Sequence, residues 1–76
     1  MGILSRLNDV FQEVFEDDEL IIEREITARD IEDWDSLMHV NLVLAAEKEF
    51  GIRLSSSEVT SLKDVGDFVD LIEEKL

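Results

Sequence analysis

The sequence predicts an all-α fold, a four-helix bundle with three main helices, a short third helix and a long loop between the first two helices. Apolar residues near both ends of the chain recur at steps of three and four, the spacing of one face of a helix. Residues 36–50, between them, are rich in helix formers. A hydrophobic content of 45% beside 36% charged residues is too apolar for a disordered acidic tail, so we expect residues 1–76 to fold as a single domain.

The first helix is expected over residues 3–16 and the long loop over residues 17–35. The acidic run at residues 16–19 ends the helical spacing, and no sustained period follows it. Residues 20–22 are compatible with a short strand, although the chain offers no obvious strand to pair with them. A connection of this length is uncommon in a compact domain and is usually functional.

The remaining helices have recognisable ends. Gly51 closes the second helix after Phe50, because glycine best tolerates the left-handed conformation that follows a helix. Serines at residues 55–57 and Glu58 supply N-capping groups for a third helix of one or two turns. Asp64 can cap the last helix, whose apolar residues again follow the helical spacing.

Composition narrows the function. With 20 acidic and 7 basic residues the net charge is −13, which disfavours nucleic acid and anionic membranes and favours basic protein partners. The chain has no cysteine, and its first residues lack the continuous apolar stretch of a signal peptide or membrane span. A core this thin cannot enclose a deep active site. We therefore expect a monomeric cytoplasmic protein that is not an enzyme, binds no metal and does not insert into a membrane.

The second helix has more apolar surface than a core requires. Leu42, Val43, Ala46 and Phe50 form one stripe that can serve the core. Leu37, Val40 and Leu44 form a second stripe, which we interpret as a recognition surface. The alternative is that this second stripe packs under the long loop.

Ser36 lies where the long loop enters the second helix. A phosphate esterified to this serine would lie near unsatisfied backbone N–H groups and the positive end of the helix dipole. The alternative is that Asp35 or Ser36 only caps the helix.

Three stretches carry a family resemblance: WDSL at residues 34–37, EKEFGI at residues 47–52 and KDVGDFV at residues 63–69. Together with the length, the acidity and the order of the helices, they resemble the acyl carrier protein family over nearly the whole chain. The resemblance implies a covalent 4'-phosphopantetheine arm on Ser36 that carries acyl groups as thioesters, so that Ser36 is a modified residue and not a nucleophile. It also implies that Asp35 helps a phosphopantetheinyl transferase to bind magnesium and that Leu37 contacts partner enzymes.

The chain departs from the common pattern of this family. Carriers of fatty-acid synthesis have acidic residues where this chain has Met38 and Asn41, Lys48 interrupts the acidic end of the second helix, and Trp34 replaces a small or aliphatic residue. These departures indicate a specialised stand-alone carrier. We assign arm transfer and partner recognition to Asp35, Leu37, Met38, Val40, Asn41 and Leu44.

For the remaining residues, the sequence allows both a structural and a functional interpretation. His39, the only histidine, is expected to be partly buried and hydrogen-bonded, or to line with Ala46 the mouth of an acyl pocket. Trp34 is expected to dock on the core, with partner contact as the alternative. The acidic runs lack the glycine and closing glutamate of a calcium-binding loop and are interpreted as solvated charge.

The sequence predicts a carrier for a fatty-acid-like, polyketide or other specialised pathway, with a phosphopantetheinyl transferase and acyl- or aminoacyl-loading enzymes and transferases as partners. One alternative is an aminoacyl or peptidyl carrier. The other is a non-covalent adaptor whose acidic helical surface binds a basic partner. Intact mass after co-expression with a phosphopantetheinyl transferase separates the carriers from the adaptor.

Overall fold

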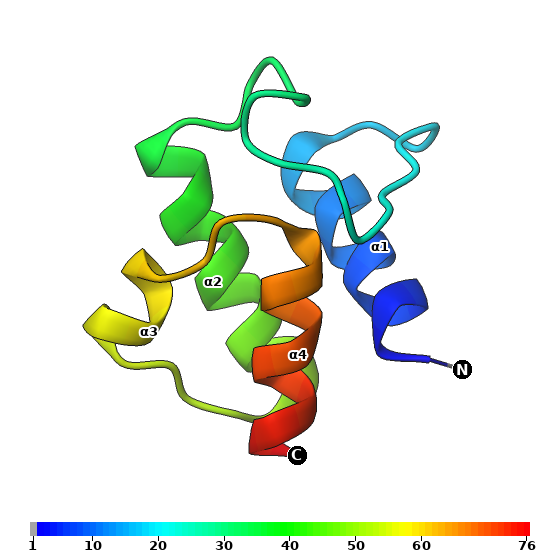
Figure 1. Ribbon diagram of the computed structural model, residues 1–76. Helices are drawn as coiled ribbons and strands as arrows, with labels where there is room; N and C mark the ends of the chain where they lie inside the picture. The colour runs from blue at the N-terminus through cyan, green and yellow to red at the C-terminus, as the bar shows by residue number, and fades with distance from the viewer. Residues whose placement is uncertain (1) are drawn as a thin grey trace.

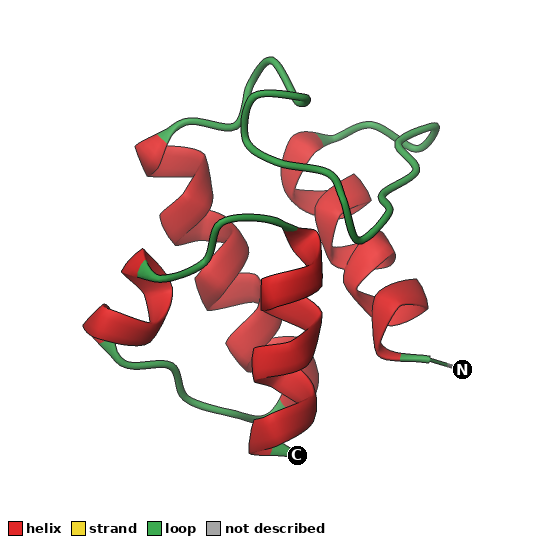
Figure 2. Ribbon diagram, in the orientation of Figure 1, coloured by secondary structure: helices red, strands yellow, loops and turns green. Residues whose placement is uncertain are grey.

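The computed structural model describes residues 2–76 and contains four helices, α1 (Ile3–Phe15), α2 (Ser36–Phe50), α3 (Ser56–Thr60) and α4 (Val65–Lys75). α1 packs against both α2 and α4. The short α3, which follows α2 in the chain, lies on the side of the bundle away from α1 (Figure 1). Helices and loops account for the fold, and the longest loop joins α1 to α2 across one end of the bundle (Figure 2). The predicted all-α architecture, with its short third helix and long first loop, is confirmed.

Each helix ends where local hydrogen bonds can replace those of the helix. Glu16, with φ 54°, terminates α1 in the left-handed conformation, and Gly51, with φ 66°, terminates α2. Ser55 and Glu58 form a reciprocal capping box at the start of α3. The Asp64 carboxylate accepts a hydrogen bond from the Asp67 amide at 2.8 Å and caps α4. The capping roles read from the sequence are therefore confirmed.

Residues 20–22 belong to the loop and form no strand. Side chains of α1 take the place of a neighbouring strand: the Asn8 and Gln12 amides donate to the Leu20 carbonyl at 3.3 and 2.9 Å, and the Ile22 amide donates to Asn8 Oδ1 at 2.7 Å. Because these side chains satisfy the backbone, the segment needs no sheet, and the strand interpretation is wrong.

The core lies between α1, α2 and α4 and is closed by the long loop. Phe11 of α1 and Phe68 of α4 are fully buried, with ring centroids 6.5 Å apart. The loop contributes Ile22 and Trp34, which are also buried. The predicted core stripe of α2 is confirmed, because all four of its residues are buried: Leu42, Val43, Ala46 and Phe50.

The loop is fastened to the first turn of α4. The Gly66 amide donates to the Arg24 carbonyl at 2.8 Å, and the Val65 amide donates to the Ile26 carbonyl at 2.9 Å. A Cβ atom at Gly66 would lie 3.1 Å from the Arg24 carbonyl oxygen, so glycine permits this close approach. The loop carbonyls thus satisfy amides that would otherwise be free at a helix start.

Ion pairs at the surface link α1 to α2 and the long loop to α4. Arg6 of α1 pairs with Glu49 of α2 at 3.2 Å and stacks over the Phe50 ring, with its guanidinium carbon 4.5 Å from the ring centroid. Arg24 pairs with Asp70 at 2.9 Å, and this carboxylate raises the pKa of Arg24. No helix in the described part of the chain combines the length and apolar character needed to span a bilayer.

Candidate functional site

Ser36 is the first residue of α2 and is exposed. Asp35 precedes it as the N-cap residue: its Oδ1 accepts a hydrogen bond from the Met38 amide at 2.9 Å, and its carbonyl accepts one from the His39 amide at 2.8 Å. The capping role therefore belongs to Asp35, which leaves the Ser36 side chain free of that task. The first turn of α2 itself contains no acidic residue, so the Asp35 carboxylate at the cap is the negative group beside Ser36.

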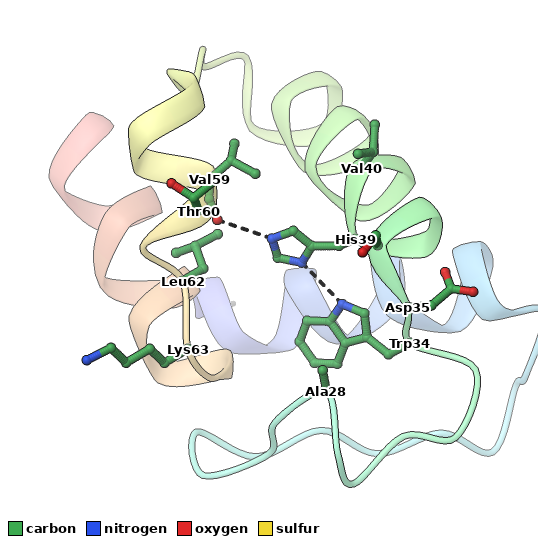
Figure 3. A pocket seen from close by; sticks show the side chains of 10 residues that line it. Ala28, Trp34, Asp35, His39, Val40, Val59, Thr60, Leu62 and Lys63 are labelled. Carbon is green, nitrogen blue, oxygen red and sulfur yellow. Dashed lines mark hydrogen bonds between the residues drawn. The ribbon is translucent and has the colours of Figure 1, made fainter.

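Ser36 stands at the mouth of a cavity of about 460 Å³ between the long loop, α2 and the α3 region. Figure 3 shows Trp34 and His39 next to each other and joined by a hydrogen bond, with Val59 and Leu62 across from His39. The lining is mainly apolar and includes two charged residues at its rim. Its residues are Ala28, Trp34, Asp35, Ser36, His39, Val40, Val59, Thr60, Leu62 and Lys63.

A hydrogen-bonded chain of three groups crosses this cavity. Trp34 Nε1 donates to His39 Nδ1 at 3.1 Å, and His39 Nε2 lies 3.2 Å from the Val59 carbonyl oxygen (Figure 3). An indole nitrogen only donates and a carbonyl oxygen only accepts, so these two contacts require the tautomer that carries its proton on Nε2. The two rings are also stacked, with centroids 5.9 Å apart. His39 therefore joins the loop and α3 to α2.

These contacts settle the structural interpretations of two residues. His39 is half-buried and hydrogen-bonded as expected, and it also lines the cavity beside Ser36. Trp34 docks on the core as expected: it is buried, and its ring meets that of Phe11 edge-on, with centroids 5.3 Å apart. Ala46 is fully buried in the core and does not line the cavity at Ser36.

The second apolar stripe of α2 faces outward. Leu37, Val40 and Leu44 are 70%, 50% and 58% exposed, so the alternative that they pack under the loop is wrong. Met38 instead turns partly inward and packs against the core, whereas Asn41 is exposed. The exposed apolar surface is thus a narrow row along α2.

Sequence reasoning missed the wall that α3 and its following turn contribute. Val59, Thr60, Leu62 and Lys63 lie more than twenty residues from Ser36 in the sequence, yet they line the same cavity. Val59 and Leu62 were visible as an apolar pair, but nothing in their spacing shows which helix they face. Among the described residues, no group of three or more histidine, cysteine or acidic side chains is arranged to hold a metal ion.

Comparisons with known proteins agree on one family. Residues 5–72 match the family model described as "Phosphopantetheine attachment site". The chain is 41% identical to an acyl carrier protein of Acidothermus cellulolyticus, over 92% of this chain and 83% of that protein. It is 34% identical to an acyl carrier protein of Thermotoga maritima, over 97% of this chain and 91% of that protein.

A solved structure shows the same fold. The solution structure of a holo acyl carrier protein from Geobacter metallireducens superposes with a TM-score of 0.91 and 41% sequence identity, over 99% of this chain and 86% of that one.

Proposed function

The chain belongs to the acyl carrier protein family, and from this premise we propose that Ser36 bears the prosthetic arm and that the protein serves a specialised biosynthetic pathway. Members of this family are carriers and not enzymes, and their covalently bound cofactor is 4'-phosphopantetheine. When bound, this group supplies a thiol that holds an acyl chain as a thioester. The chain has no cysteine of its own to do so.

One observation carries the assignment of Ser36: its exposed hydroxyl lies at the start of α2 and at the mouth of an apolar cavity. A phosphodiester on this hydroxyl would lie at the positive end of the helix dipole, next to the Asp35 cap. The residues present therefore fit the group. Asp35, which ends the loop and caps the helix, is the proposed partner of the transferase's magnesium ion.

The experiment is intact mass spectrometry after incubation with coenzyme A and a phosphopantetheinyl transferase of broad specificity. We expect a mass gain of one arm for the native chain and none for Ser36→Ala. Ser56→Ala is the matched control, because Ser56 is also an exposed serine at the first position of a helix. A gain that persists in Ser36→Ala, or is lost in Ser56→Ala, would refute the assignment. No gain in the native chain would favour the non-covalent adaptor.

We propose that partner enzymes contact the exposed row of Leu37, Val40 and Leu44, together with Asn41. α2 carries only two acidic side chains, Glu47 and Glu49, and the latter is paired with Arg6. Contact with basic patches is thereby weakened, so apolar contact supplies more of the recognition. Met38 contributes less to this row than its sequence position indicates, because it turns partly into the core.

The cavity supports an acyl cargo over an aminoacyl one. Val40, Val59 and Leu62 offer apolar contacts beside Ser36, whereas a charged amino group would be costly to desolvate there. We further propose that the carrier is a cytoplasmic monomer with a single domain.

A further inference from the structure

Trp34 precedes Ser36 in the sequence and His39 follows it, and the side chains of the two are joined by a hydrogen bond of 3.1 Å. We propose that this Trp34–His39 pair positions Ser36 for transfer of the arm, acting as a clamp on the turn that presents the hydroxyl to the transferase. The inference rests on the proposed function, because it takes Ser36 as the residue that receives the arm.

The clamp is anchored on both sides of Ser36. Before it, the Trp34 ring is buried against Phe11, so this point of the chain is held to α1. After it, His39 lies in the second turn of α2 and also bonds to the Val59 carbonyl. The hydrogen bond between the two rings therefore ties the end of the loop to the body of α2 across the residue to be modified.

The backbone hydrogen bonds that precede Ser36 lie within the loop. The Trp34 amide donates to the Ile31 carbonyl at 3.1 Å, and the Asp35 amide donates to the Asp33 carbonyl at 3.1 Å, both within one short turn of the loop. Asp35 then caps α2 at the surface, where water competes for its carboxylate. The ring pair is partly buried and connects this turn to α2 and, through the Val59 carbonyl, to the region of α3.

The geometry of the turn matters for the loading step. The Ser36 hydroxyl oxygen attacks the β-phosphorus of coenzyme A and forms the new P–O bond. The bond from that phosphorus to the bridging diphosphate oxygen breaks, adenosine 3',5'-bisphosphate leaves, and the hydroxyl proton passes to a base of the transferase. Such an attack requires the oxygen to be held near the phosphorus in line with the leaving group. Trp34 and His39 are positioning residues here, because they act through the turn.

Without the hydrogen bond between Trp34 and His39, a smaller fraction of molecules has the turn in the conformation that the transferase binds. The apparent affinity falls by that fraction, while the step within the complex is unchanged. We therefore expect KM for the carrier to rise about 3- to 10-fold, the range that one neutral hydrogen bond supports. The value of kcat is expected to change by less than about 2-fold, since bound carrier has the turn in place.

Two substitutions of His39 separate its two hydrogen bonds. His39→Asn places an amide oxygen near the position of Nδ1, so it can still accept from Trp34 but cannot reach Val59. His39→Gln extends an amide to the position of Nε2, so it can still donate to the Val59 carbonyl but not accept from Trp34. Trp34→Phe keeps a ring against Phe11 and removes the indole donor.

The experiment measures KM and kcat for loading by mass spectrometry, well below the melting temperature of each variant. We expect KM to rise in Trp34→Phe and His39→Gln, without a further rise when the two are combined, and to stay near the native value in His39→Asn. Val69→Ala is the matched control: Val69 is buried in α4 and does not line the cavity, so this change lowers stability without touching the clamp.

Unchanged KM in both Trp34→Phe and His39→Gln would overturn the inference, as would an equal rise in Val69→Ala. If His39→Asn raised KM as much as His39→Gln, the bond to Trp34 would not be the one that matters, and the inference would again fail. Failure of the native chain to load at Ser36 would instead refute the proposed function, so the two ideas are tested separately.

Discussion

Replacement of Ala46 by leucine tests where the interior of this carrier has room. Ala46 is fully buried on the core side of α2, and the cavity at Ser36 does not extend to it. Leucine adds three carbon atoms at this point. If free space existed there, burial of these atoms would stabilise the domain by about 2 kcal/mol. If the core is already filled, overpacking destabilises it by about 1–3 kcal/mol.

The structure favours the second outcome. A chain of this size loses about 4–8 °C in melting temperature for each kcal/mol, so we expect Ala46→Leu to lower the melting temperature of the unloaded domain by about 5–20 °C. Ala45→Leu is the matched control on the same helix. Ala45 is half-buried and borders a surface hollow of about 280 Å³ with Val10 and Lys48, so a larger side chain there can be accommodated.

The assay is thermal unfolding of unloaded native protein, Ala46→Leu and Ala45→Leu, followed by the helical circular dichroism signal. A melting temperature of Ala46→Leu equal to or above that of the native protein would refute the reasoning. It would mean that usable space reaches Ala46, as the sequence interpretation of this residue as part of an acyl pocket requires. In that case the acylated form should also shelter its chain less well in the variant.

Three further predictions concern charge. The hydrogen bond from Lys75 at 2.8 Å, aided by the Ser55 amide, lowers the pKa of Glu58 from 4.5 to about 2, so its contribution to stability is complete above pH 4.5 and is lost as pH falls toward 2. The melting-temperature difference between the native protein and Glu58→Gln should therefore shrink as pH falls from 4.5 to 2 and disappear only below pH 2; a difference independent of pH would contradict the assignment. Millimolar magnesium or calcium should raise the melting temperature, and monovalent salt should do so more weakly, because the net charge of −13 is self-repulsive. A melting temperature indifferent to both would exclude that repulsion. Met38→Asp with Asn41→Glu should increase acyl transfer by an acyltransferase of fatty-acid synthesis, because it restores acidic contacts on α2; equal use of native and doubly changed proteins would show that these positions do not set partner choice.

The local part of the structure could be predicted from the sequence. The ends of the helices depend on contacts within about four residues, such as those of Asp35, Gly51 and Ser55, and these are visible as residue spacing. The core and surface stripes of α2 follow from the helical period in the same way. The location of Ser36 at an exposed helix start belongs to this group.

What surrounds Ser36 was decided by tertiary packing. Trp34 precedes the helix cap, so no helical period relates it to His39; in the folded chain its ring packs on Phe11 and bonds to His39. Val59 reaches the same cavity because α3 folds back toward α2, across a connection whose path no spacing encodes. The helical period shows which face of a helix is apolar. It does not show which other helix or loop packs against that face. Local structure in this carrier can therefore be predicted from its sequence, whereas the cavity beside Ser36 and the contact between Trp34 and His39 exist only in the folded chain.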